Sequence, residues 1–221
     1  VQAQQWERAE AVLRQAEEAT RKIEDAYRRA EAWSAIAQAL VQAQQWERAE
    51  AVLKQVEEAT RKIEDTWYWS QALSGIVQVL VQAQQWERAE AVAREIEDGN
   101  SWAWTLGTIA RALAQAQQWE RAEAVAREIE DVSHQSGTLS AIVEALAQAQ
   151  QWKRAEAVAG EIEDDYSWAQ ALSAIAQALG QAQQWERAEA VARRIKNAYS
   201  RAVALSAIAQ ALGQAQQWER A

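Results

Sequence analysis

One eleven-residue segment, QAQQWERAEAV, recurs along this chain with small changes and at two fixed spacings. Successive copies of its Trp lie 40, 40, 33, 33, 33 and 33 residues apart, and the last copy is truncated. Repeats of this length are typical of arrays of helix pairs, in which each pair packs on its neighbours. We therefore expect this repeat to determine the fold. The recurring residues are Trp6, Trp46, Trp86, Trp119, Trp152, Trp185 and Trp218.

Each repeat has the composition and periodicity of two helices. The chain has no Pro and is rich in Ala, Gln, Glu and Arg, which favour helix. In residues 169–182, apolar side chains recur at i, i+3, i+4 and i+7, and a second stripe follows Trp185. Glu–Arg pairs at i,i+4 mark the solvated face of this second helix. They are Glu10–Arg14, Glu90–Arg94, Glu123–Arg127 and Glu189–Arg193.

The predicted organisation is a single helical-repeat array over residues 1–221. It comprises a half-repeat at 1–25, full helix pairs at 26–65 and from 66–98 to 165–197, and a partial repeat at 198–221. The first two repeats are longer by seven residues. Because seven residues make two helical turns, we expect the second helix to extend by about 10 Å in phase.

Net charge and residue usage limit the partners that we expect. A formal charge of −9 repels phosphate backbones, which argues against nucleic acid. No apolar run approaches the ~20 residues that span a bilayer, so we expect no membrane partner. The absence of Cys excludes disulfides and fits a cytoplasmic location. The missing initiator Met and the partial repeats suggest an excised fragment or a trimmed design.

The spacing of large and small apolar residues resembles that of the tetratricopeptide repeat. In one repeat the matching residues are Leu172, Ile175, Ala176, Leu179, Trp185, Ala188, Ala192 and Ile195. The resemblance implies an all-α fold, a right-handed α-solenoid of antiparallel helix pairs, that binds a peptide or protein on the concave face lined by the first helices. Similar arrays form the sensor region of large bacterial signalling ATPases. A fragment of such a protein and a consensus design both remain open.

Three departures from that family concern the repeat length and the turns. The repeat has 33 residues rather than about 34, and Gln replaces the family's Gly at the turn between the two helices. We place that position at Gln183 and at Gln5, Gln45, Gln85, Gln118 and Gln151, where a left-handed backbone costs about 1 kcal/mol per residue. The family's Pro is replaced by a Ser/Asp/Asn joint, whose expected N-caps are Asn100 or Ser101, Ser133, Ser167 and Ser200.

Aromatic residues fall into two groups. The six complete-motif residues Trp6, Trp46, Trp86, Trp119, Trp152 and Trp185 lie in the apolar stripe, and we expect them in the core. Those near the joints are not all in stripe phase, so they either wedge between successive helix pairs or contact a partner. These are Trp67, Tyr68, Trp69, Trp102, Trp104, Tyr166, Trp168 and Tyr199.

The resemblance also implies a row of concave-face residues. They are mostly Ser and Gln, which suit either an extended peptide backbone or simple solvation, and they lack the clustered Lys and Arg that bind a carboxylate. The partner-binding candidates are Trp104, Arg111, Gln78, Gln115, Glu144, Gln177 and Ser173. The wider row adds Ser34, Gln38, Gln42, Gln71, Ser74, Gln82, Gly107, Ser140, Gln148, Gln170, Gln181, Ser206, Gln210 and Gln214.

No combination of residues predicts catalysis, a cofactor or a metal site. The lone His134 has no second His or Cys nearby, and the acidic run at 161–165 fits a solvated edge. No nucleophile motif or phosphate-binding loop is present. The leading hypothesis is therefore a non-enzymatic protein-interaction scaffold. The alternative is a structural or designed array that forms homo-oligomers head to tail, with residues 199–215 of one copy on residues 6–25 of the next.

Overall fold

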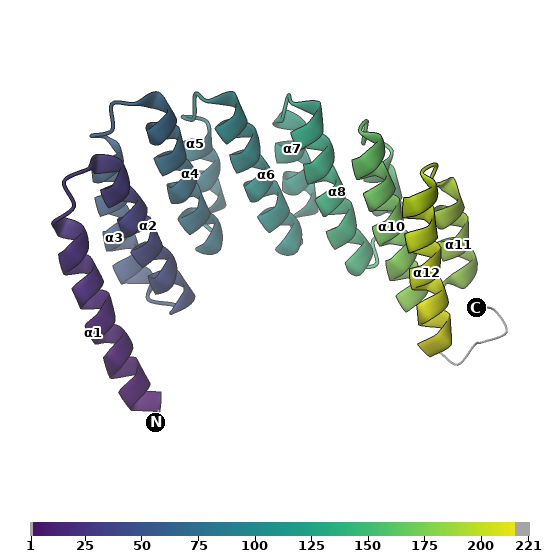
Figure 1. Ribbon diagram of the computed structural model, residues 1–221, viewed down its shortest axis with the longest axis horizontal. Helices are drawn as coiled ribbons and strands as arrows, with labels where there is room; N and C mark the ends of the chain where they lie inside the picture. Colours follow the sequence, from purple (N-terminus) through teal and green to yellow (C-terminus); the bar gives the residue numbers. More distant parts are fainter. Residues whose placement is uncertain (1, 215–221) are drawn as a thin grey trace. The chain divides into compact units, whose positions relative to one another are not determined.

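The computed structural model describes residues 2–214 of the 221, with side chains described for residues 8–213. In this part of the chain all regular structure is α-helical, in 12 helices without a strand (Figure 1). The fold class predicted as all-α is thus confirmed. Among the described residues, no helix combines the length and apolar character needed to cross a bilayer.

The helices alternate between two kinds. The even-numbered helices, here called A helices, all have 17 residues: α2 (Ala26–Gln42), α4 (Thr66–Gln82), α6 (Gly99–Gln115), α8 (Val132–Gln148), α10 (Asp165–Gln181) and α12 (Ala198–Gln214). The odd-numbered B helices begin, after the first, at the recurring Trp. They are α1 (Gln2–Arg21), α3 (Trp46–Thr60), α5 (Trp86–Ala93), α7 (Trp119–Glu128), α9 (Trp152–Ala159) and α11 (Trp185–Arg194).

The chain divides into two compact units, residues 1–109 and 110–221, with the division inside α6. In unit 1, α2 packs against α1, α3 and α4, and α4 packs against α5. In unit 2, α8 packs against α7, α9 and α10, and α10 packs against α11 and α12. The largest fully buried side chains are aliphatic, and they include Leu40, Leu53 and Leu80 in unit 1 and Leu139, Leu146 and Leu172 in unit 2.

The seven additional residues of the longer repeats lie in the B helix. α3 has 15 residues whereas α5 and α9 have 8. Leu53 and Val56 remain buried, so the longer helix keeps its apolar stripe in phase. The predicted in-phase extension is confirmed.

Each A helix that leads into a described B helix ends in a left-handed Gln. Gln44, Gln84, Gln117, Gln150 and Gln183 have φ between 56° and 59°. At Gln84 the backbone N–H donates to the Val81 carbonyl, and the N–H of the next residue donates to the Leu80 carbonyl at 2.8 Å. These two bonds define a Schellman motif, which normally uses Gly.

The left-handed position was predicted correctly only at Gln183. In the other repeats it falls one residue before Gln45, Gln85, Gln118 and Gln151, which instead precede the B helices as their N-cap residues. Gln5 lies inside α1. The motif requires its left-handed residue directly after the C-cap, so the first Gln of each pair takes it.

Acidic or amide side chains cap the A helices, and the expected Ser caps were wrong. Asp25, Asp65, Asp131 and Asp164 each accept a hydrogen bond from the backbone N–H three residues later. Asp98 and Asn197 do the same for Ser101 and Ser200. The N–H groups of Ser101, Ser167 and Ser200 are therefore donors within the first turn. Asp and Ser are both favourable N-cap residues, and in these helices the acidic or amide residue occupies the N-cap position.

The recurring Trp residues are not uniformly buried. Trp86 and Trp185 lie in the core, Trp119 and Trp152 are half-buried, and the side chain of Trp6 lies outside the described residues. Trp46 is 52% exposed, so its predicted core position was wrong. Stripe phase sets the direction of a side chain, but this Trp begins its helix. Trp86 and Trp185 also begin their helices and are buried, so stripe phase alone does not decide whether this ring is covered.

Candidate partner-binding surface

The same face of the A helices lines a hollow in each unit. Counting each A helix from 1 to 17, the lining side chains come mainly from positions 2, 6, 9 and 13, which form one stripe on a helix. We call this stripe the A face. It contains the residues predicted from the tetratricopeptide resemblance at positions 6, 9 and 13, adds position 2 at its beginning, and leaves out the predicted residues at position 17, such as Gln42 and Gln82.

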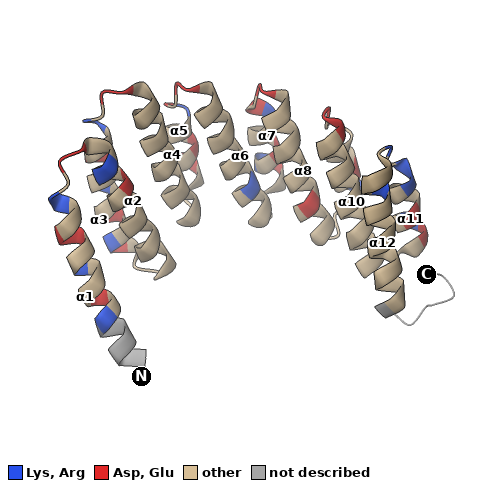
Figure 2. Cartoon of the chain, viewed as in Figure 1, with Lys and Arg blue, Asp and Glu red and all other residues tan. Residues whose placement is uncertain are grey.

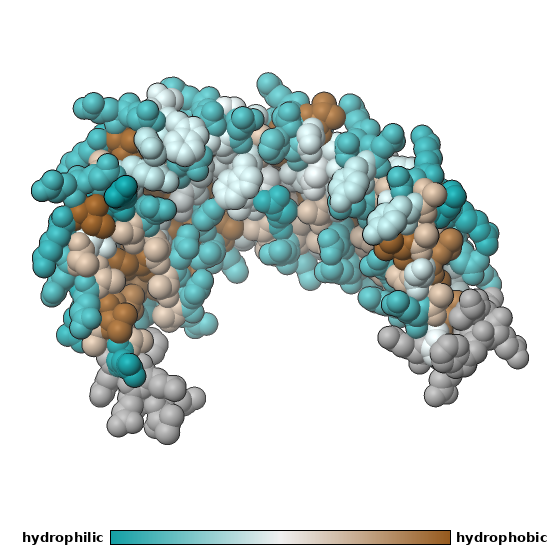
Figure 3. All heavy atoms as spheres, in the orientation of Figure 1, coloured by the Kyte–Doolittle hydropathy of each residue, from teal (hydrophilic) through white to brown (hydrophobic). Residues whose placement is uncertain are grey.

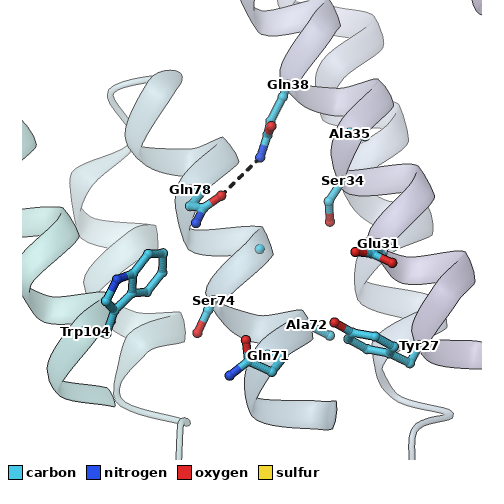
Figure 4. Close-up of a pocket in the computed structure, with 11 residues that line it drawn as sticks. Tyr27, Glu31, Ser34, Ala35, Gln38, Gln71, Ala72, Ser74, Gln78 and Trp104 are labelled. Atoms are coloured by element: carbon cyan, nitrogen blue, oxygen red, sulfur yellow. Dashed lines mark hydrogen bonds between the residues drawn. The ribbon is translucent and has the colours of Figure 1, made fainter. Parts of the chain in front are cut away.

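The hollow of unit 1 has a volume of about 260 Å³ and lies between α2 and α4, with Trp104 of α6 at one side. Figure 4 shows Trp104 across the hollow from Tyr27 and Glu31. Gln38 Nε2 donates to Gln78 Oε1 at 3.4 Å across the hollow. The lining residues are Tyr27, Glu31, Ser34, Ala35, Gln38, Gln71, Ala72, Ser74, Gly75, Gln78 and Trp104.

Buried hydroxyl groups join two helices beside this hollow. The Ser74 and Thr105 hydroxyls lie 2.8 Å apart, and both side chains are buried. Each hydroxyl also lies within hydrogen-bonding distance of the carbonyl four residues earlier in its own helix. Gln71 Nε2 donates to Ser101 Oγ at 3.0 Å. These bonds hold α4 against the first part of α6 and orient Gln71 at the hollow wall.

An acidic and aromatic group closes one end of the unit 1 hollow. The Tyr27 and Tyr68 rings lie 4.8 Å apart, and Trp67 meets Tyr68 edge-on at 5.0 Å. Burial, followed by the negative charge of Glu31 and the neighbouring Tyr68, raises the pKa of Tyr27. The Tyr27 phenol therefore stays protonated at neutral pH and can donate a hydrogen bond.

The hollow of unit 2 has a volume of about 400 Å³ and lies between α8, α10 and α12. Tyr166 and Tyr199 occupy position 2 of α10 and α12, equivalent to Tyr27 of α2. Glu144 supplies the carboxylate and accepts a hydrogen bond from Gln148 at 3.3 Å. The lining residues are Ser140, Glu144, Tyr166, Gln170, Ser173, Ala174, Gln177, Tyr199, Ser200 and Val203.

The joint aromatics divide between the two readings left open by the sequence. Trp69, Trp102 and Trp168 are half-buried, as expected of wedges, and Lys196 Nζ lies 5.9 Å from the centre of the Trp168 ring. Trp67, Tyr68, Trp104, Tyr166 and Tyr199 are exposed. Figure 3 shows aromatic and apolar side chains among the hydrophilic surface of this view, including over α12. The exposed group is available for contact with a partner.

The structure gathers most of the predicted partner-binding residues. Gln78 and Trp104 line the unit 1 hollow, and Glu144, Ser173 and Gln177 line that of unit 2. Arg111 and Gln115 are exposed but line neither of these two hollows. Desolvation lowers the pKa of Arg111, which remains protonated at neutral pH.

Sequence reasoning missed Tyr27 and Glu31 as hollow residues. The signal that could have found them is their i, i+4 spacing ahead of Ser34 and Gln38, which continues the A-face stripe by one further turn.

The B helices carry most of the ion pairs, many of which link successive B helices. Figure 2 shows where the acidic and basic residues lie along the chain. Arg48 Nη1 donates to Glu10 Oε1 at 2.7 Å, and Arg88 bonds Glu50 in the same way at 2.9 Å. The pKa of Glu10 is lowered by its hydrogen bond with Gln45 and by the charges of Arg48 and of the expected i,i+4 partner Arg14, so Glu10 interacts with both Arg residues. The other pairs expected at i,i+4 are present, at Glu90–Arg94, Glu123–Arg127 and Glu189–Arg193.

His134 belongs to a helix cap. Its Nδ1 lies 2.6 Å from Asp131 Oδ1, and its backbone N–H donates to the same oxygen. In the part of the chain whose side chains are described, no three His, Cys, Asp or Glu residues are grouped to hold a metal ion.

Comparisons with known proteins identify no family. No protein-family model matches the sequence, and no curated protein matches it. The crystal structure of Ton1535 from Thermococcus onnurineus NA1 is similar over 91% of this chain and 85% of that one, at 14% sequence identity and a TM-score of 0.44. A likeness this distant carries no argument about function.

Proposed function

We propose that this chain is a non-enzymatic interaction scaffold of the tetratricopeptide type, a right-handed α-solenoid of antiparallel helix pairs that holds a peptide or protein on its A face. The repeated alternation of A and B helices, and the packing of α2 on α4 and of α8 on α10, support this architecture. Small residues such as Ala37, Ala49, Ala176 and Ala188 are fully or almost fully buried and allow close approach of the helices.

The observation that carries the proposal is the recurrence of one kind of hollow. Two units with different side chains at the helix joints each place a Glu, at least one Tyr, and a set of Gln and Ser residues around a cavity. Amide and hydroxyl groups can donate to and accept from an extended peptide backbone, and exposed aromatic rings supply apolar contact. B-helix surfaces, in contrast, direct many of their polar groups into ion pairs with each other.

The experiment is to select ligands from a random peptide library displayed on phage and to measure their affinity by calorimetry. The hollows are then filled by the paired variant Ala35→Arg and Ala174→Arg, which changes position 10 of α2 and α10. The control is Ala51→Arg and Ala190→Arg, which places the same charge at exposed B-helix positions.

Circular dichroism first checks that both double variants remain helical. We expect the hollow-filling variant to weaken binding about tenfold or more, a loss of about 1.4 kcal/mol, and the control to leave the affinity nearly unchanged. Equal losses in the two variants, or failure of the selection to yield any binding peptide, would contradict the proposal.

A second candidate, head-to-tail association of copies, is favoured by the terminal helices. Leu205 of α12 is 38% exposed, whereas the equivalent Leu172 of α10 is fully buried. Val12 of α1 is 58% exposed, whereas the equivalent Val52 of α3 is 7% exposed. Leu205 is thus exposed at a position that the other A helices bury, and Val12 at a position that α3, α7, α9 and α11 bury. Heterologous contacts between two such faces form rings or filaments.

Light scattering over a range of concentrations tests this alternative. Association predicts a mass that rises with concentration and returns to the monomer value in Val12→Glu and Leu205→Glu variants. A monomer mass at every concentration would exclude it.

A further inference from the structure

The carboxylates of the A face differ from those of the B helices in their partners. On the B helices, the Glu residues that pair with Arg side chains are Glu10, Glu17, Glu50, Glu57, Glu120, Glu123 and Glu156, and Glu161, which follows α9, does the same. In the described side chains, Glu31 and Glu144 form no ion pair, although both line a hollow. No Lys or Arg lines either hollow. Each hollow therefore holds an uncompensated negative charge.

The walls around Glu31 suit a cation with an apolar stem. Tyr27 lies one helical turn before Glu31 on α2, and Trp104 faces them from the other side of the hollow (Figure 4). Aromatic faces attract ammonium and guanidinium groups, and they also pack against the methylene stem of Lys or Arg. Gln38 and Gln78 lie further along the same hollow and offer amide groups to the adjoining peptide backbone.

The hollow of unit 2 is lined by the same kinds of side chain, which lie at different helix positions. Its carboxylate, Glu144, occupies position 13 of α8 rather than position 6, and two tyrosines, Tyr166 and Tyr199, replace the single Tyr27. Val203 adds an exposed apolar contact to this hollow. Both hollows thus have one carboxylate and aromatic rings among their lining residues.

We infer that the A face recognises a basic peptide segment, whose Lys or Arg side chains enter the hollows to pair with Glu31 in unit 1 and Glu144 in unit 2. The inference rests on the proposed scaffold function and names the chemical class of its ligand. The net charge of −9 adds a long-range attraction for a cationic partner.

Fluorescence anisotropy with labelled alternating peptides tests the inference on the full chain. The probes are a Gly-Arg peptide, a Gly-Glu peptide and a Gly-Ser peptide of equal length, measured at about 150 mM salt to screen diffuse attraction. The variant pair is Glu31→Gln with Glu144→Gln. Its matched control is Glu18→Gln with Glu47→Gln, which removes the same charge from exposed B-helix positions.

We expect the Gly-Arg peptide to bind, and each hollow substitution to weaken it by about fivefold, the size of one partly exposed ion pair. The control pair should change the affinity by less than twofold. Equal weakening by the control would overturn the inference, because binding would then follow net charge alone. Binding of Gly-Ser or Gly-Glu as tightly as Gly-Arg would overturn it while leaving the scaffold function supported. If no probe binds and the phage selection also yields no ligand, the scaffold function itself fails.

Discussion

Arg127 donates two parallel hydrogen bonds to Glu161, from Nε to Oε2 and from Nη2 to Oε1, both at 2.9 Å. This fork joins the end of α7 to the residues that follow α9 within unit 2, and Glu123 also accepts from Arg127. The Glu161 carboxylate keeps a low pKa chiefly because of the Arg127 hydrogen bonds. Two parallel hydrogen bonds favour this particular pairing, but the side chains of Arg127 and Glu161 are both more than a third exposed to solvent.

We predict that the Arg127–Glu161 coupling energy is below about 1 kcal/mol, because solvent screens an exposed pair. A double-mutant cycle of Arg127→Ala and Glu161→Ala, measured by urea unfolding, gives this value. The coupling should shrink when the salt concentration is raised. A coupling that is both large and insensitive to salt would show that the pair is effectively buried.

The Asp caps predict a loss of stability in acid. Asp98, Asp131 and Asp164 accept hydrogen bonds from the residue three positions later, which lower the pKa of each carboxyl. A carboxyl with a lowered folded-state pKa stabilises the fold fully above its unfolded value, about 3.9. That stabilisation is lost as the pH falls through the folded-state pKa.

Replacing all three Asp caps by Asn should keep the caps but remove their titration, because Asn caps helices as well as Asp does. We expect thermal melts followed by circular dichroism to give a similar Tm for variant and parent at pH 7. As the pH is lowered from about 5 to about 2, the Tm of the variant should fall less than the Tm of the parent protein. Parallel curves for the two proteins would mean that other carboxylates control acid unfolding.

Gln84 should tolerate Gly with a gain in stability. Its φ of 56° is the left-handed conformation, which costs a residue with a side chain about 1 kcal/mol, partly offset by the greater entropy of Gly in the unfolded chain. We expect Gln84→Gly to raise the free energy of unfolding by a few tenths to about 1 kcal/mol.

The neighbouring Gln85 provides the control for that change. It has φ of −89°, and its side chain bonds both Arg88 and Glu50. Gln85→Gly should therefore lower the stability in the same urea titration. A gain at both positions would point to a general effect of Gly on the turn.

The two Trp positions should differ sharply in their response to truncation. Trp86 is 7% exposed and Trp46 is 52% exposed. We expect Trp86→Ala to cost about 3–5 kcal/mol, since it leaves a cavity, whereas Trp46→Ala should cost much less. Denaturant unfolding of the two single variants measures both losses, and similar values would contradict the burial difference.

Periodicity predicted the helices and the A face because both depend on the direction of side chains around a helix axis. Ser173, Gln177 and Glu144, which the tetratricopeptide resemblance placed in one row, line the unit 2 hollow, and their role in binding stays a prediction. The exposure of Trp46 was not predictable, because stripe phase gives the direction of a side chain and not the extent to which its surroundings cover it. The caps were missed because the joints contain both Ser and Asp, and local preference does not decide between them. The hollows themselves depend on tertiary packing, which a single repeat does not encode.

The difference in length between α3 and α5 separates two properties of the repeat. Material was added to the B helix in a whole number of turns, while all A helices kept 17 residues. The B helix can therefore change its length by whole turns while the A helix beside it keeps its length and its A-face residues. If the proposed recognition by the A face holds, stability and recognition can change independently, the first through the odd-numbered helices and the second through the even-numbered ones.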